Sequence, residues 1–202
     1  QLYVGYDAGS DGTYTQSGGT NTITNGLDLG TNSGSKGTYN LSGRGELTAG
    51  YEAIGVSGIG RFNQTGGTNT VTQGLYVGFN AGSDGIYTQS GGTNIVNGDL
   101  YLGYSGPSGS LPAAKGTYTL FGTGSLTVSG SIYVGYDGVG TFNLSAVPFD
   151  NTGTVTIGGK GKLNIGAEGI LSNHGDGVVN NEGGTLNIYD GGMLNNYDYG
   201  ML

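Results

Sequence analysis

The stretch Gly-Thr-Tyr-Thr-Gln-Ser-Gly-Gly-Thr-Asn at residues 12–21 returns almost unchanged as Gly-Ile-Tyr-Thr-Gln-Ser-Gly-Gly-Thr-Asn at residues 85–94. Both copies belong to a unit of about 24 residues that opens with a short apolar run ending in glycine. The glycines that mark this unit are Gly5, Gly30, Gly55, Gly78 and Gly103. A repeat of this length predicts a solenoid, in which each unit packs on its neighbours.

Each repeat contains three short runs in which apolar and polar residues alternate, and glycine-rich corners separate the runs. This pattern predicts an all-β fold, a three-sided parallel β-helix (β-solenoid) of roughly eight coils with about 24 residues per coil. The alternation places Leu2 and Val4 inside the coil and Tyr3 outside. Glu52 stands where this register expects leucine, which indicates either a bulge or a register error of one residue.

The corner after the aromatic residue of each repeat comes in two kinds. One kind pairs glutamine with asparagine, and the pairs are Gln16 with Asn21, Gln64 with Asn69, and Gln89 with Asn94. The other kind pairs two leucines, Leu41 with Leu47 and Leu120 with Leu126. A buried amide without a partner costs about 1–3 kcal/mol. We therefore predict that the glutamine and asparagine of each pair face inward, touch across the corner and bond to each other and to the corner backbone, in a structural rather than catalytic role.

The whole chain, residues 1–202, is predicted to form a single solenoid domain. Residues 1–153 contain the Tyr- and Gly-rich repeats. Residues 154–202 form Asn-rich coils whose sides are about eight residues long, and stacked asparagines can form amide ladders there. Two insertions, residues 105–114 and 146–151, hold all 3 prolines and are predicted to emerge as corner loops.

Composition limits the classes of partner. Glycine makes up 47 of the 202 residues, there is no cysteine, and the net charge is -8. The acidic balance argues against binding nucleic acid or an anionic membrane surface, and no apolar run is long enough to span a bilayer as a helix. Because the chain starts with Gln1 inside a repeat, we interpret it as a piece of a secreted precursor, the alternative being a fragment of a cytosolic repeat protein.

Aromatic side chains gather on the outward side of the first run of each repeat. Stacked at the strand spacing of about 4.8 Å, they form a stripe that either stiffens the solenoid or contacts a glycan or another subunit. Exposed Phe149 in the second insertion is a further candidate contact, with a functionless loop as the alternative. The predicted contact residues of the stripe are Tyr3, Tyr6, Tyr76, Phe79, Tyr101, Tyr104, Tyr133 and Tyr136.

The residues of an enzyme or a metal site do not form a recognisable pattern. The one histidine, His174, has no nucleophile or acid in a catalytic arrangement with it, and no cofactor is expected. Equivalent corners carry Asp7 with Asp11 and Asn80 with Asp84, which offer at most a weak cation site. Outward threonines on the third run resemble an ice-binding face, although Glu46, Ile95 and Asn97 interrupt them.

The repeat Gly-x-Tyr-x-Gln-Ser-Gly-Gly-Thr-Asn, followed by Leu-Tyr-Val-Gly-Tyr, resembles the repeats of secreted bacterial β-solenoid surface proteins, such as autotransporter passengers and adhesins. The resemblance covers nearly all of the chain. It implies a right-handed coil and a non-enzymatic component of the cell surface or extracellular matrix.

Two functional classes follow from these observations. The first is a structural subunit that stacks head to tail into a filament, with Leu2 and Val4 at one end meeting Met201 and Leu202 at the other. The second is an adhesin whose tyrosine stripe or loops bind a glycan or a host surface. Ice binding and polysaccharide lyase activity are minor alternatives.

Overall fold

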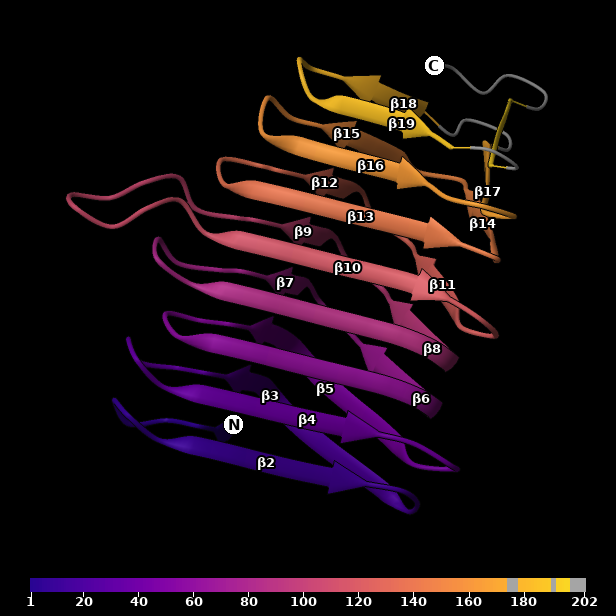
Figure 1. Ribbon diagram of the computed structural model, residues 1–202. Helices are drawn as coiled ribbons and strands as arrows, with labels where there is room; N and C mark the ends of the chain where they lie inside the picture. The colour runs from indigo at the N-terminus through magenta and orange to yellow at the C-terminus, as the bar shows by residue number, and fades with distance from the viewer. Residues whose placement is uncertain (174–177, 190–191, 197–202) are drawn as a thin grey trace.

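A computed structural model describes residues 1–173, 178–189 and 192–196, and it shows an all-β parallel solenoid with about 25 residues per turn. The front strands run in one direction, the back strands return in the other, and the chain rises as a right-handed coil (Figure 1). The prediction of a three-sided parallel β-helix of roughly eight coils is confirmed, since the described residues stack eight strands on each side. The described part of the chain has no helix that could cross a bilayer.

Three sides make up each coil, and four long strands bend around a corner to serve two sides. The bent strands are β3 (Thr20–Leu29), β5 (Glu46–Ile54), β6 (Ile59–Val71) and β8 (Asp84–Val96). Side one also contains β1 (Leu2–Val4), β7 (Leu75–Val77), β9 (Leu100–Leu102), β12 (Ile132–Val134), β15 (Thr154–Ile157) and β18 (Val178–Asn181). Side two also contains β2 (Asp11–Gln16), β4 (Lys36–Leu41), β10 (Lys115–Phe121), β13 (Val139–Ser145), β16 (Gly161–Ile165) and β19 (Thr185–Ile188). Side three also contains β11 (Ser125–Val128), β14 (Pro148–Asn151), β17 (Ile170–Asn173) and β20 (Met193–Asn196).

Coils stack in parallel register, so each residue lies over its counterpart one repeat away. Glycine stacks on glycine at the corner before side two, where Gly12 pairs with Gly37 and Gly37 pairs with Gly60. A Cβ on Gly37 would lie 2.0 Å from the carbonyl oxygen of Val4, so no larger residue fits there. The repeated glycines are therefore needed for the close approach of neighbouring turns.

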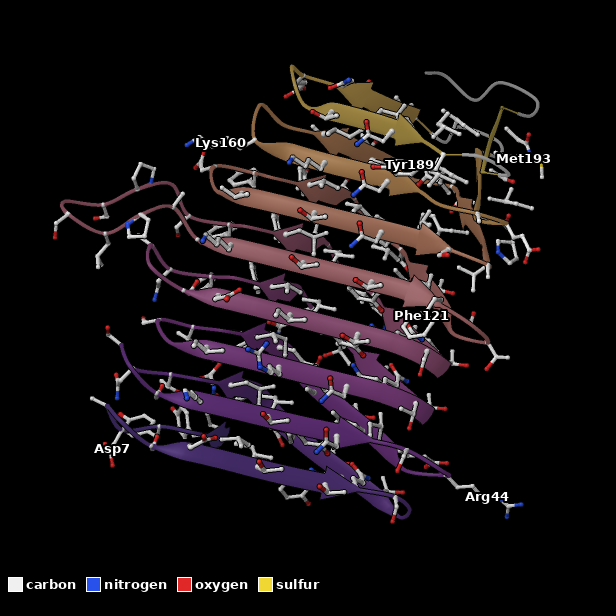
Figure 2. The ribbon with its side chains drawn as sticks, in the orientation of Figure 1. Asp7, Arg44, Phe121, Lys160, Tyr189 and Met193 are labelled. Carbon is white, nitrogen blue, oxygen red and sulfur yellow. The ribbon has the colours of Figure 1, made fainter. Side chains whose placement is uncertain are left out.

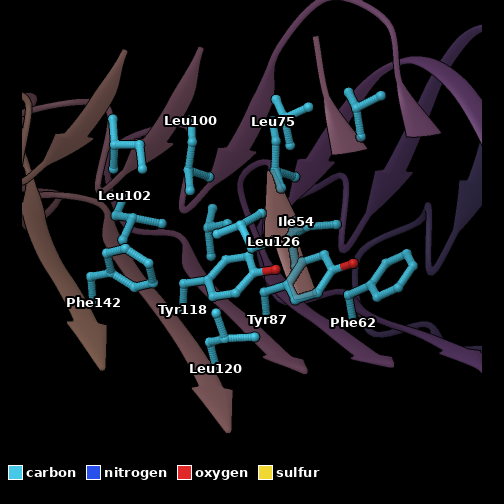
Figure 3. Close-up of a cluster of buried hydrophobic side chains, with 14 of the residues drawn as sticks. Ile54, Phe62, Leu75, Tyr87, Leu100, Leu102, Tyr118, Leu120, Leu126 and Phe142 are labelled. Atoms are coloured by element: carbon cyan, nitrogen blue, oxygen red, sulfur yellow. The ribbon is translucent and has the colours of Figure 1, made fainter. Parts of the chain in front are cut away.

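Aromatic rings form a column through the interior on side two. Tyr14, Tyr39, Phe62, Tyr87 and Tyr118 stack with ring centroids 4.5 to 5.1 Å apart. Phe142 ends this column by turning edge-on to Tyr118 (Figure 3). Leucine, isoleucine and valine from all three sides fill the rest of the core.

Glutamine and asparagine of each pair face inward as predicted, but the predicted hydrogen bond between the two side-chain amides is not formed. Instead, the hydroxyl of the tyrosine one coil later lies between them: Tyr118 Oη donates to Gln89 Oε1 at 2.5 Å and accepts from Asn94 Nδ2 at 2.9 Å. The same arrangement joins Tyr39 to Gln16 and Asn21, and Tyr87 to Gln64 and Asn69.

The leucine corners follow the same rule with a different ring. Phe62 lies one coil after Leu41 and Leu47, and Phe142 lies one coil after Leu120. A phenylalanine has no hydroxyl, so two leucines meet it without leaving a polar group unpaired. The covariation in the sequence therefore involves three residues, and the third lies on the next coil.

Glutamine also determines the shape of its corner. Gln89 Nε2 donates to the carbonyl oxygen of Gly92 within its own corner and to that of Ser125 on the next coil. Gln16 and Gln64 make the equivalent bonds. The leucine corners lack this side-chain donor and close through backbone bonds instead, such as Gly124 N to Phe121 O. The glutamine side chain thus supplies a hydrogen bond that the backbone supplies in the leucine corners.

Glu52 lies inside the solenoid in correct register, so the register error offered from the sequence is wrong. A bulge does lie nearby, because β3 shifts against β5 between Ile23 and Gly26, just before the rung of Glu52. It pairs with Leu27 on one coil and Leu75 on the next, and its side chain is fully buried. Asn69 Nδ2 donates to Glu52 Oε2 at 3.1 Å, while Glu52 Oε1 and Asn69 Oδ1 have no partner. Burial raises the pKa of Glu52 to about 8 and the hydrogen bond from Asn69 lowers it less, so the acid is protonated at neutral pH.

The two predicted insertions have different outcomes. Residues 105–114 form a loop that projects from the corner between β9 and β10, as expected (Figure 1). Residues 146–151 are not an insertion loop, because most of them form β14, which pairs with β17 on side three. Phe149 is accordingly 3% exposed and packs edge-on against Phe142, so the prediction that it is an exposed contact is wrong.

The Asn-rich end continues the solenoid and contains an amide ladder. Asn164 Nδ2 donates to Asn143 Oδ1 at 2.7 Å, and Asn187 Nδ2 donates to Asn164 Oδ1 at 2.8 Å. These side chains face outward from the middle of side two. Each amide bonds to the equivalent amide one coil away, which helps hold the coils in register.

Removing the hydroxyl of Tyr118 tests the three-residue rule. Tyr118→Phe removes the hydroxyl that Gln89 Oε1 and Asn94 Nδ2 share, and we expect it to lower the free energy of unfolding by about 1–3 kcal/mol in urea melts. Adding Gln89→Leu and Asn94→Leu should restore much of the loss, because the two side-chain groups that lost the hydroxyl are then gone and the corner can close through backbone bonds, as the leucine corners do. The matched control is Tyr104→Phe on the outer surface, with a change below about 0.5 kcal/mol. A triple variant no more stable than Tyr118→Phe would contradict the rule.

Glu52 predicts a loss of stability as the pH rises from about 4.5 to about 8. Because its pKa is higher in the folded chain than the ordinary value of 4.5, its contribution is complete below pH 4.5 and is lost as pH rises to about 8. Each pH unit in this window removes about 1.4 kcal/mol. Glu52→Gln should remove this dependence, since its uncharged amide keeps an oxygen that accepts from Asn69 at every pH. Urea melts between pH 5 and about 9 measure this pH dependence of stability, and Glu46→Gln on the same strand is the control. Equal pH profiles for Glu52→Gln and the parent chain would refute the assignment.

Candidate functional site on the aromatic face

The outward side of side one carries two parallel columns of rings, which we call the aromatic face. In the first column Tyr76, Tyr101 and Tyr133 stack with centroids 5.1 and 4.9 Å apart. The second column stands just beyond the corner glycines. Its members are Phe79, Tyr104 and Tyr136, with centroids 5.2 and 5.3 Å apart. Both columns arise because the same two positions of the repeat are aromatic in three successive coils.

Rings of one column meet those of the other edge to face. The centroids lie 5.0 to 5.4 Å apart and the planes cross at 70 to 87°. Perpendicular contacts place the positive edge of one ring against the negative face of the other, which is favourable beyond the area buried. The six rings therefore form one rigid array, and Tyr101 at its centre contacts four other rings.

Asp99 anchors the array to the backbone. Tyr101 Oη donates to Asp99 Oδ2 at 3.0 Å, while Asp99 Oδ1 accepts from the backbone N–H of Ser131 at 2.7 Å. Burial, together with the bond to Asp99 and its charge, raises the pKa of Tyr101. The tyrosine is thus held in its neutral form, as a hydrogen-bond donor to the carboxylate.

The array stops at the third and second coils. Here the first column holds Ala53 and Asp28 in place of tyrosine, and the rings resume on the first coil with Tyr3, which meets Tyr6 edge to face at 4.9 Å. The aromatic face therefore has a gap of two rungs. All eight predicted stripe residues face outward, but the gap separates two of them from the other six.

A hollow of about 310 Å³ occupies this gap. Its floor includes Ala53, whose position in the column lies between Asp28 and Tyr76. The remaining lining residues are Tyr51, Val56, Gln73, Gly74 and Phe79. Three aromatic rings, one carboxylate and one amide thus surround a single space. The sequence contained the signal for this hollow, because Asp28 and Ala53 interrupt the tyrosine ladder, but the interruption was not interpreted as a cavity.

Asp28 is the charged group of the hollow, and it is 7% exposed. Its Oδ2 accepts a hydrogen bond from Gln1 Nε2 at 2.6 Å, and the same amide donates to Tyr51 Oη at 2.7 Å. Burial raises the pKa of Asp28, against the opposing effect of the bond from Gln1. Tyr51 lies flat over Gly26, where a Cβ would come within 2.3 Å of its ring. The second coil therefore has glycine there to make room for the ring.

The predicted cation corners do not converge. Asp7 and Asp11 belong to the first coil, whereas Asn80 and Asp84 belong to the fourth, in equivalent register. Asn80 Nδ2 bonds to Ser57 Oγ at 3.0 Å. Within the described ranges, no three acidic, histidine or cysteine side chains come together as a metal site would require. Of the charged side chains, Asp7 and Lys160 lie on one edge of the solenoid and Arg44 lies on the other (Figure 2).

The remaining sequence predictions concern the end residues, the threonines and the histidine. Val4 is buried and Leu2 half-buried in the first coil, while Met201, Leu202 and His174 lie outside the described residues. Glu46 and Ile95 do interrupt the outward threonines of side three, as expected.

Comparison with known proteins adds no family. A scan against family models, a search of curated proteins and a search of solved structures found no match to this chain. The β-solenoid fold therefore rests on the structure, and the resemblance to secreted bacterial surface proteins stays a prediction.

Removing the ring of Tyr101, at the centre of the array, should lower the stability of the fold more than removing the ring of Tyr3, which lies beyond the gap with Tyr6. Tyr101→Ala removes contacts with four rings and the bond to Asp99, and we expect a loss of about 2–4 kcal/mol in the free energy of unfolding. Tyr3→Ala removes one edge contact and should cost below about 1 kcal/mol. Urea melts of both variants measure the difference. Equal losses would show that the columns do not act as one array.

Proposed function

We propose that this chain is a non-enzymatic structural protein of the cell surface or extracellular matrix. The observation that supports this role most is the continuity of its ladders. Aromatic rings, hydrogen-bonded amides and aliphatic side chains each stack from coil to coil, so every coil is supported by the next. Such a structure resists bending and local opening, because each coil shares its core with two neighbours.

The side chains favour a mechanical role over a catalytic one. A polar cluster is buried in the core, where Gln64, Asn69, Tyr87 and Glu52 hold coils together. The array on the aromatic face binds neighbouring coils in the same way from outside. Both sets of residues are used for stacking, which is the requirement of a scaffold.

Self-association extends the same principle. Coil-on-coil stacking within the chain uses parallel strands in register, and head-to-tail stacking of subunits would repeat that geometry between copies. A heterologous contact of this kind generates an open polymer. Eight stacked strands per side, at the strand spacing of about 4.8 Å, would give an axial repeat of about 38 Å.

Negative-stain electron microscopy of concentrated protein tests this proposal. We expect filaments with that axial repeat. Tyr14→Lys places a charge on the stacking surface of the first coil, where Tyr14 is 38% exposed, and should abolish filaments while leaving the circular dichroism spectrum unchanged. Arg44→Ala at an exposed corner is the matched control and should form filaments normally. Single particles alone, at every concentration, would contradict the filament.

A second candidate function, glycan binding by an adhesin, is favoured by the hollow in the aromatic face. Exposed rings beside a carboxylate and an amide suit a sugar, which has an apolar ring face and hydroxyl groups at its edge. The two functions are compatible, because a scaffold can present a binding site on its side.

A further inference from the structure

We propose that the hollow at the break in the aromatic face binds an uncharged pyranose sugar, which takes the place of the missing rungs of the ladder. The inference rests on the second candidate function and specifies its site and ligand class. It begins from register: Asp28 and Ala53 occupy the two rungs between Tyr3 and Tyr76. Three coil steps separate these tyrosines, or about 14 Å at the strand spacing.

The ring faces that border the gap have no aromatic partner on that side. Tyr76 stacks on Tyr101, and Phe79 stacks on Tyr104, both toward later coils. Their opposite faces are directed to the third coil, where Ala53 and Val56 replace the next rings. An aromatic face carries partial negative charge, so it attracts the positive C–H groups of a pyranose ring. The site thus provides a stacking platform at the position of the absent rung.

Polar groups lie at the other side of the hollow. Asp28 offers a carboxylate oxygen beyond the one that accepts from Gln1, and Gln73 offers an amide with both donor and acceptor. Hydrogen bonds to a carboxylate from a sugar hydroxyl are stronger than bonds between neutral groups. Apolar rings on one side and these groups on the other match the two chemical surfaces of a pyranose.

Charge selects among sugars. The chain has a net charge of -8, and the carboxylate of Asp28 lies in the hollow itself. A uronic or sialic acid would bring a second carboxylate next to Asp28 and lose affinity through repulsion. The site therefore takes neutral hexoses and N-acetylhexosamines, and it rejects acidic sugars.

The test combines filling of the gap with a control elsewhere on the same face. An array of neutral, N-acetylated and uronic-acid oligosaccharides identifies the ligand, and calorimetry then measures its affinity for each variant. Ala53→Tyr restores a rung, and we expect it to abolish binding while raising the unfolding midpoint. Tyr76→Ala removes the platform and should weaken binding at least tenfold. Tyr133→Ala, two coils from the gap in the same column, should bind as the parent chain does.

Asp28→Asn tests the selection by charge, since it should admit uronic-acid oligosaccharides that the parent chain rejects. Circular dichroism establishes that each variant is folded. Three results would overturn the proposal: no neutral pyranose retained on the array, full affinity in folded Ala53→Tyr, or a dimer that Ala53→Tyr converts to monomer, which would assign the hollow to a second copy of the chain. Filaments without sugar binding would overturn this site alone and leave the structural function standing.

Discussion

In-register stacking of parallel strands is the constraint on which the rest of this structure depends. Each backbone group bonds to the coil before or after it, so every side chain must fit beside its counterpart about 4.8 Å away. Glycines at the corners satisfy this requirement through their small size, as Gly37 does against the carbonyl of Val4. Rings satisfy it by stacking, and amides satisfy it by bonding to the equivalent amide. Each residue in this solenoid must therefore match the residues one repeat away in size, in ring stacking or in hydrogen bonding.

Buried polar groups follow from the same constraint. The hydroxyl of Tyr118 has to meet Gln89 and Asn94, because the register places them together in a dry interior. Glu52 is tolerated among leucines since Asn69 reaches it from the adjacent polar cluster. On the outer surface the constraint is weaker, because water can solvate a side chain that has no matching partner on the neighbouring coil. The aromatic face can therefore stop at Ala53 and leave a hollow, whereas the inner ring column continues without a break from Tyr14 to Tyr118.

Much of the fold could be predicted from the repeat, and the failures have physical causes. Spacing and alternation predicted the coil, its three sides and the outward tyrosines, because each depends on local periodicity. Phe149 was misassigned because a proline in its segment suggested a loop, whereas β14 tolerates Pro148 at its first position. Glu52 was doubted because a lone acid in a leucine ladder is unfavourable, and its partner Asn69 is remote in sequence. The hollow could have been anticipated, since an interrupted ladder on an exposed side leaves space.

The sequence by itself determined that this chain coils as a parallel solenoid and which residues face inward, since period and alternation are local properties that backbone geometry converts directly into faces. Only the tertiary structure decided which atoms meet. It replaced the expected amide pair with a bridging tyrosine hydroxyl, placed Glu52 against Asn69, and opened a cavity between Asp28 and Tyr76. These contacts depend on side-chain reach between coils, and a repeat pattern records the positions of residues without recording the distances between their atoms.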